Sequence, residues 1–347
     1  MLYDDQEWVN RYRPASKTPW FGRKDGAGSK RFHEIFVCDD LRQPLETIPY
    51  AMNFGLVGFA CDEGVRRNHG RPGAVEGPTA FREMLAKLPV MAPDNWKFYD
   101  VGDITCDDGD LETSQRCLGK TVHNLLEQGI FPLVIGGGHE VSWGNYQGVR
   151  ASLPKSHLSI INFDSHFDIR SYEEQASSGT SFLQIHDDCH EKGIPFSYSC
   201  LGIQNYGNTS DLFEKAKQIG VQYVSADEIH KGSHHLDSSV NQAVEYGEGI
   251  YLTICLDVFA SPFAPGVSAP QSLGLFPYHV IPAITHIARS GKVVCFDIAE
   301  LNPKYDRDHT TVQLAALLTS TFIHEVVSEH YVRGPLTCCK DYLECES

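Results

Sequence analysis

The sequence alternates short apolar runs with longer stretches of helical spacing, and this alternation restricts the possible folds more than any other feature. The runs are rich in Val, Ile, Leu and Phe, as in strands that are covered on both faces. They predict strands at Gly55–Ala60, Pro132–Ile135, Leu158–Phe163, Tyr251–Leu256 and Lys292–Phe296. Helical spacing predicts helices at Thr79–Leu88, Leu111–Gln128, Asp211–Gln218 and Val312–Glu329. We therefore predict an α/β fold, a single three-layer α/β/α domain with a mostly parallel sheet.

The start of the chain lacks this alternation. Pro14, Pro19 and Gly22 break any period there, so we predict an irregular N-terminal arm over residues 1–45. No internal repeat and no linker divides the remainder, which predicts a single catalytic domain over residues 46–347. In a parallel α/β sheet, a functional site is expected beyond the carboxyl ends of the strands.

The charge balance excludes several kinds of partner. The chain of 347 residues has 29 Lys and Arg against 45 Asp and Glu, a formal net charge of −16. Proteins that bind nucleic acid or anionic membranes normally carry the opposite imbalance. No run approaches the roughly 18 consecutive apolar residues of a membrane span, and the first residues lack the features of a secretory leader. The eleven cysteines are then most simply reduced thiols, and we predict a cytoplasmic protein.

Three potential metal ligands follow one buried strand at alternate positions. Asp164, His166 and Asp168 come directly after Leu158–Phe163. Alternate residues of an extended backbone point to the same side, so these three side chains can converge on one ion. The alternative is a strand-end turn in which an aspartate caps a helix and the histidine forms a local hydrogen bond.

A glycine-rich segment, Gly136-Gly137-Gly138-His139, follows another predicted strand. Three glycines allow the backbone to pass close to another group and bring His139 to the edge of the sheet. A phosphate-binding loop is a distant alternative, weakened because no lysine follows, and the spacing does not match a dinucleotide fingerprint. A glycine turn beside a hydrogen-bonded histidine is the alternative to a metal ligand.

Two further strand ends carry acidic side chains. Cys255 and Asp257 share one strand face, where an aspartate is costly to bury unless it is paired or bound to a metal. Asp297 and Glu300 follow the last predicted strand, and for Asp297 surface capping is the alternative. This mixture of oxygen and nitrogen donors favours Mn²⁺ or a similar divalent ion over a structural zinc bound by cysteines. With up to six ligands, two ions that share a carboxylate and generate hydroxide from bound water are the natural arrangement.

These segments resemble the motifs of the ureohydrolase superfamily, the arginase and agmatinase group. Residues 137–139 resemble its G-G-x-H motif, and residues 164–168 resemble its D-A-H-x-D motif. Residues 254–266 are similar to its D-x-D strand followed by a P-G element, and residues 297–303 resemble the segment with its substrate-binding carboxylate. The similarity runs from about residue 55 to residue 303 in the family's order. It implies an arginase-like fold.

The resemblance also implies a role for each site residue. It implies that two Mn²⁺ ions per subunit are bound by His139, Asp164, His166, Asp168, Cys255 and Asp257. Asp164 would bridge the ions, and a metal-bridging hydroxide would be the nucleophile, with no protein base assigned. Glu300 would hold the amidine or guanidine group of the substrate. The resemblance further suggests a homo-oligomer.

Two departures from the superfamily pattern favour its formimidoylglutamase branch. Cys255 stands where many members have a bridging aspartate, and a thiolate is a softer ligand that can change metal preference. Ser178 stands where arginase-like members carry a proton-shuttle histidine. Residues 64–74 and 266–270 also resemble this branch. Membership would imply hydrolysis of a small-molecule amidine, N-formimidoyl-L-glutamate, to L-glutamate and formamide in histidine degradation.

The substrate of that branch carries two carboxylates, which need cationic or amide partners. Arg71 and Arg67 are the candidates, although arginines beside a glycine-rich loop are often structural. The leaving nitrogen would receive its proton from Asp257 or from solvent. Two other functions stay open: a guanidine hydrolase of the agmatinase, guanidinobutyrase or arginase type that releases urea, and a non-catalytic metal-binding relative.

Overall fold

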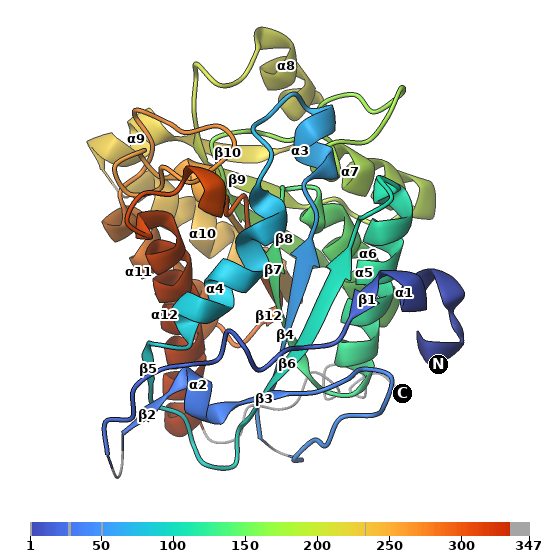
Figure 1. Ribbon diagram of the computed structural model, residues 1–347. Coiled ribbons are helices and arrows are strands. Elements are labelled where there is room, and N and C mark those ends of the chain that lie inside the picture. Colours follow the sequence, from blue (N-terminus) through green and yellow to red (C-terminus); the bar gives the residue numbers. More distant parts are fainter. Residues whose placement is uncertain (1, 27–28, 50, 233, 334–347) are drawn as a thin grey trace.

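The computed structural model describes residues 2–26, 29–49, 51–232 and 234–333. A large sheet runs through the middle of this part of the chain, with helices on both faces (Figure 1). In spatial order its strands are β1 (Tyr12–Arg13), β6 (Lys97–Thr105), β4 (Asn53–Ala60), β7 (Phe131–Gly136), β12 (Val293–Ala299), β11 (Gly249–Cys255), β8 (Leu158–Phe163), β9 (Tyr198–Ile203) and β10 (Gln222–Ser225). β3 (Phe36–Cys38) also pairs with β6, and β2 (Lys30–Arg31) and β5 (Pro89–Val90) form a separate small sheet. The pairings of the large sheet are parallel except for the antiparallel pairing of β1 with β6.

The helices form two layers, one on each face of the sheet. One layer contains α2 (Phe32–Ile35), α4 (Gly77–Leu85), α9 (Ala226–Lys231), α10 (His234–Tyr246), α11 (Pro277–Arg289) and α12 (Thr310–Arg333). The other layer contains α1 (Gln6–Arg11), α5 (Leu111–Glu127), α6 (Val141–Ser152), α7 (Ser181–Lys192) and α8 (Ser210–Gln218). The short helix α3 (Glu63–Arg67) follows β4 at the carboxyl edge of the sheet. Within the described residues, no helix combines the length and the hydropathy that a membrane span requires.

Each face of the sheet carries its own apolar core. In β4, Phe54 and Leu56 belong to one core, whereas Val57 and Phe59 belong to the other. Because successive side chains of a strand point to opposite faces, both sets are buried and the strand reads as one continuous apolar run. The predicted three-layer α/β/α fold with a mostly parallel sheet is therefore confirmed.

The predicted strands correspond to β4, β7, β8, β11 and β12, and the predicted helices to α4, α5, α8 and α12. The prediction missed other elements, among them β6, β9, β10, α6, α7, α10 and α11. The strand β6 was not predicted because Asp100 and Asp103 interrupt its apolar pattern. Their carboxylates pair with the buried guanidinium of Arg82, at 2.8 Å in each case. That ion pair joins segments that are separate in the sequence, so no local pattern reveals the strand.

Residues 1–45 are not irregular throughout, because α1, β1, α2 and β3 lie within this segment. Trp8 is buried, stacks on Tyr12 with ring centroids 4.2 Å apart, and donates a hydrogen bond of 2.8 Å to Thr121. Pairing with β6 and packing on α5 order a segment whose prolines and glycines break any local period. The division into an arm and a separate catalytic domain stays a prediction.

Candidate metal centre and substrate pocket

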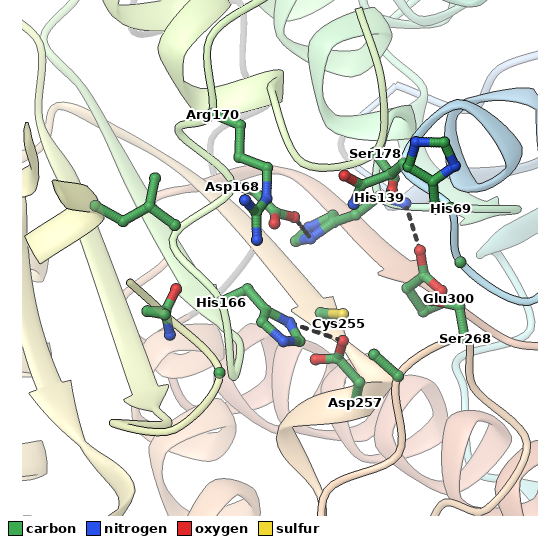
Figure 2. Close-up of a pocket in the computed structure, with 16 residues that line it drawn as sticks. His69, His139, His166, Asp168, Arg170, Ser178, Cys255, Asp257, Ser268 and Glu300 are labelled. Atoms are coloured by element: carbon green, nitrogen blue, oxygen red, sulfur yellow. Dashed lines mark hydrogen bonds and ion pairs between the residues drawn. The ribbon is translucent and has the colours of Figure 1, made fainter. Parts of the chain in front are cut away.

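The carboxyl ends of β7, β12, β11 and β8, which are neighbours in the sheet, meet at a cavity of about 440 Å³. The predicted site residues that line this cavity are His139, His166, Asp168, Cys255, Asp257 and Glu300 (Figure 2). Asp164 is completely buried directly beside them. Four segments that are far apart in the sequence therefore place their side chains in one site, because parallel strands end at the same edge of a sheet.

One group of donor atoms gathers around His139. Its Nδ1 lies 2.8 Å from Asp164 Oδ2 and 3.0 Å from Asp168 Oδ2. Nevertheless, Nδ1 forms no hydrogen bond of normal geometry with any described residue. Ligand atoms of His139, Asp164 and Cys255 all lie within 4.8 Å of one another. This half of the site therefore offers nitrogen, oxygen and sulfur donors to one ion.

A second group of donor atoms gathers around His166. Its Nδ1 lies 3.1 Å from Asp257 Oδ2 and 3.7 Å from Asp164 Oδ1. Ligand atoms of Asp164, His166 and Asp257 also lie within 4.8 Å of one another. Asp257 Oδ1 is buried and forms no hydrogen bond with a described residue. Asp164 belongs to both groups and faces each with a different oxygen.

The convergence of Asp164, His166 and Asp168 does not come from an extended strand, as the sequence predicted. β8 ends at Phe163, and Asp168 has a left-handed backbone with a φ of 48°. The His166 amide donates to Asp164 Oδ1 at 2.7 Å, and the Ser165 hydroxyl donates to the carbonyl oxygen of Asp257 at 2.8 Å. A turned loop held by these hydrogen bonds therefore directs the side chains.

The glycine segment passes against the backbone that follows β4. A Cβ atom on Gly137 would lie 1.5 Å from the carbonyl oxygen of Cys61, so only glycine fits there. The Gly137 amide donates to the carbonyl oxygen of Phe59 at 2.8 Å, and the Glu300 amide donates to that of Gly137 at 2.8 Å. The close neighbour that the three glycines predicted is thus the main chain of Cys61, and this contact places His139.

The shifted pKa values of the candidate metal ligands indicate a site that positive charge would stabilise. Burial lowers the pKa of His139, but interactions with the Asp164 and Asp168 carboxylates raise it well above its usual range. Burial raises the pKa of Asp257. Burial, and then the charge of Asp164, also raises the pKa of Cys255. Several buried acidic groups with converging, unpartnered donor atoms fit divalent cations.

Glu300 lies on another side of the cavity and has a strained backbone with a φ of 68°. Its Oε1 accepts a hydrogen bond of 3.1 Å from the His139 amide, whereas its Oε2 is buried without a partner of normal geometry among the described residues. Burial, and then the charge of Asp257, raises the pKa of Glu300 to about 7. A buried carboxylate oxygen without a partner is suited to a cationic ligand.

The sequence comparisons agree with this geometry. A model of the Arginase family matches residues 52–324. The chain belongs to the arginase family. Similar relatives include formimidoylglutamase of Legionella pneumophila (strain Lens), 43% identical over 93% of this chain and 99% of the relative. Formimidoylglutamase of Aeromonas salmonicida is 46% identical over 89% of this chain and 98% of the relative.

Solved structures of this family have the same fold. The structure of formimidoylglutamase from Bacillus subtilis matches with a TM-score of 0.76 at 21% identity, over 88% of this chain and 94% of that one. The structure of Trypanosoma cruzi formiminoglutamase with Mn²⁺ matches with a TM-score of 0.72 at 27% identity, over 80% of this chain and 94% of that one. At 21% identity the first likeness concerns the fold alone.

In this arginase-family chain, Arg71 does not line the cavity, contrary to its predicted role. Its guanidinium donates to the carbonyl oxygens of Val267 and Ser268 and lies 4.2 Å from the centroid of the Tyr305 ring. Arg67 is also engaged elsewhere, in ion pairs with two glutamates. Both arginines join loops to one another, and the structure therefore gives no support to either as a carboxylate-binding residue.

Arg170 is the one arginine or lysine among the described residues that line the cavity. Its side chain is exposed, and its guanidinium points into the cavity toward Asp168 and His166 (Figure 2). The sequence prediction missed it, although it continues the alternation of Asp164, His166 and Asp168 by one step. Arg170 therefore replaces Arg71 as the candidate partner of a substrate carboxylate.

Polar groups complete the rim of the cavity. Ser178 lines the cavity and accepts a hydrogen bond of 3.2 Å from Asn68. His69 also lines the cavity, with a left-handed backbone at a φ of 59°. Within the motif of residues 64–74, only Arg67 and Arg71 had a predicted role. The structure places Asn68 and His69 at the rim.

Proposed function

We propose that this protein is a binuclear manganese hydrolase that cleaves N-formimidoyl-L-glutamate with water to L-glutamate and formamide. Relatives named formimidoylglutamase align with about nine tenths of the chain and nearly all of their own length. The observation that carries the proposal is the distribution of charge in the cavity. Glu300 and Arg170 lie apart in it, with His139 and Asp168 between them (Figure 2). This suits a substrate with an amidinium at one end and carboxylates at the other.

Two Mn²⁺ ions fit the two groups of donor atoms. One ion would be held by His139, Asp164, Asp168 and Cys255, and the other by Asp164, His166 and Asp257. The solved Trypanosoma cruzi formiminoglutamase with Mn²⁺ supports manganese as the metal. When bound, such ions polarise the substrate and lower the pKa of a bound water, so that hydroxide is available at neutral pH.

The protein's own side chains position the substrate. Glu300 would pair with the amidinium through charge-assisted hydrogen bonds and orient the formimidoyl carbon toward the metal donors. Arg170 would bind a carboxylate of the glutamate part. Water adds its oxygen to the carbon, the bond from this carbon to the glutamate nitrogen breaks, and that nitrogen takes up a proton. Ser178 cannot replace a histidine in this transfer, so the proton comes from Asp257 or from solvent.

A substrate panel tests the proposal. We expect the Mn²⁺-loaded protein to release formamide from formimidoylglutamate and to release no urea from arginine, agmatine or guanidinobutyrate. Urea without formamide would instead identify a guanidine hydrolase. A protein that binds one ion and hydrolyses none of these compounds would be a non-catalytic relative.

A variant of Arg170 tests the proposed orientation of the substrate in the cavity. Arg170→Gln removes the cation at the cavity, and the loss of a charge-assisted hydrogen bond should raise KM for formimidoylglutamate by about 10- to 100-fold. Because Arg170 would bind the glutamate part of the substrate and not the reacting carbon, kcat should change much less. Arg66→Gln is a matched control, since Arg66 is exposed and pairs with Asp62 and Glu63 outside the cavity. An unchanged KM in Arg170→Gln would contradict this orientation.

We also infer a cytoplasmic protein and a homo-oligomer, with no nucleic-acid or membrane partner. The eight cysteines of the described residues are free thiols, which supports a reducing compartment. The other three cysteines lie outside the described residues. The homo-oligomer rests on the family resemblance, and light scattering of the purified protein would test it.

A further inference from the structure

A chain of hydrogen bonds connects the imidazole of His139 to Asp297 inside the sheet. His139 Nε2 lies 3.1 Å from Thr253 Oγ1, which lies 2.6 Å from Asp297 Oδ1. Asp297 Oδ2 accepts hydrogen bonds from the Tyr251 hydroxyl and, at 2.8 Å, from the Asn145 amide. All five side chains are buried. This series of hydrogen bonds therefore begins at a candidate metal ligand and ends at a carboxylate that solvent does not reach.

Asp297 is consequently not a surface cap, the alternative that the sequence left open. The predicted strand stopped at Phe296, but β12 extends to Ala299 and includes Asp297. The parallel register of β11 and β12 pairs Thr253 with Asp297 directly. Two polar side chains that lie 44 positions apart in the sequence are thus neighbours in the interior.

With Asp297 ionised, the supply of protons fixes the direction of these hydrogen bonds. The amide nitrogen of Asn145 can only donate, and the Asp297 carboxylate accepts from it and from two hydroxyls. Thr253 has one hydroxyl proton, which it gives to Asp297. Toward His139 the Thr253 oxygen can then only accept, so the proton of the neutral imidazole lies on Nε2. The lone pair of Nδ1 is left facing Asp164 and Asp168.

We propose that Thr253 and Asp297 are positioning residues that hold His139 in the tautomer able to bind a divalent ion through Nδ1. The inference rests on the metal-binding role proposed above for His139, but not on the identity of the substrate. Hydrogen bonds to the second nitrogen of a ligating histidine commonly fix its ring and its tautomer in this way. A merely structural polar cluster would stabilise the fold without selecting between the two ring nitrogens.

Asp297→Asn reverses the direction of these hydrogen bonds with almost no change in the shape of the side chain. The Asn145 amide requires an acceptor, so the new side chain places its oxygen there and its NH₂ group toward Thr253. Thr253 must then donate to His139 Nε2, which moves the imidazole proton to Nδ1. We expect Mn²⁺ affinity at the His139 half of the site to fall by about 10- to 100-fold. The half with His166 and Asp257 should keep its ion.

The measurement is a titration of metal-free protein with Mn²⁺, followed by electron paramagnetic resonance and with a chelator as competitor. The spin-coupled signal of two ions should give way to the signal of one isolated ion in Asp297→Asn. Thr253→Val should have the same effect, whereas Thr253→Ser keeps the hydroxyl and should restore binding of both ions. If Asp297→Asn fails to fold, the pair of Thr253 variants still decides the question.

Tyr251→Phe is the matched control, because it removes a hydrogen-bond donor to Asp297 without changing the direction of the hydrogen bonds from His139 through Thr253 to Asp297. Its affinity for both ions should stay within about threefold of the unmodified protein's, far less than the change expected for a lost partner of a ligating histidine. Equal weakening in Tyr251→Phe and Asp297→Asn, or two tightly bound ions in Thr253→Val, would overturn the inference. An unmodified protein that binds no Mn²⁺ would instead refute the metal centre itself. A different substrate specificity would leave the inference intact.

Discussion

Replacing Gly137 by alanine tests whether close backbone packing places His139. The new Cβ would lie 1.5 Å from the carbonyl oxygen of Cys61 and 2.6 Å from its carbonyl carbon. The obstacle is main chain, and it is held in place because the Gly138 amide donates to the same carbonyl oxygen at 3.2 Å. No rotation of a side chain can relieve this collision. The glycine segment itself must therefore move.

The size of that movement follows from the contact distance. A separation of 3.0 Å is the least that real Cβ atoms show, so the segment must shift by about 1.5 Å. Such a shift breaks two or three of the backbone hydrogen bonds that join it to Phe59, Cys61 and Glu300. At about 1 kcal/mol each, with some strain added, the free energy of unfolding should fall by about 2–4 kcal/mol. His139, two positions later, would leave the roughly 0.5 Å tolerance of a working site.

Two measurements check this prediction: urea unfolding of the metal-free protein and the Mn²⁺ content after gel filtration. Gly249→Ala is the control, because the nearest atom to its new Cβ is a Val294 methyl group at 3.3 Å and its φ is not positive. That variant should change the free energy of unfolding by less than about 1 kcal/mol and keep both ions. Normal unfolding and two bound ions in Gly137→Ala would refute the reasoning.

Three further outcomes are expected. Asp164→Asn should abolish activity and lower the metal content found by elemental analysis, because it weakens the shared carboxylate, and full activity with two ions would contradict the proposed bridge. Cys255→Asp replaces a soft donor by a hard one and should raise the preference for Mn²⁺ over Zn²⁺ in a competition assay; an unchanged preference would show that the thiol is not a ligand. Removal of metal by EDTA should stop turnover and lower the melting temperature. Added Mn²⁺ at 100 times its Kd should return about 2.7 kcal/mol of stability.

The family membership and most of the candidate site could be predicted because both depend on local patterns. Continuous apolar runs identified the central strands, and chemically reactive side chains at their carboxyl ends identified the edge at which a site forms. His139 and Asp257 could be placed together before their distances were known, since parallel strands bring their ends to one edge. The resemblance to a family then supplied roles that the pattern alone left open.

The choice between arginines could not be made in this way. Arg71 belongs to a glycine-rich motif, yet its partners are Val267, Ser268 and Tyr305, almost two hundred or more positions away. Arg170 had no predicted role, and only the loop after β8, with the left-handed backbone at Asp168, directs it into the cavity. The length of an arginine side chain allows either outcome, and the packing of distant loops selects between them.

The sequence by itself determined the parallel α/β fold, the edge of the sheet that carries the site and the donor atoms available there. These properties follow from hydrophobic periodicity and from the residue types at strand ends, which are local. Only the tertiary structure decided that Asp297 is buried behind Thr253, that residues 1–45 pack on the sheet, and that Gly137 lies against Cys61. Each of these depends on strand register and close packing between segments distant in the sequence, and the energies of such contacts have no signature in any single segment.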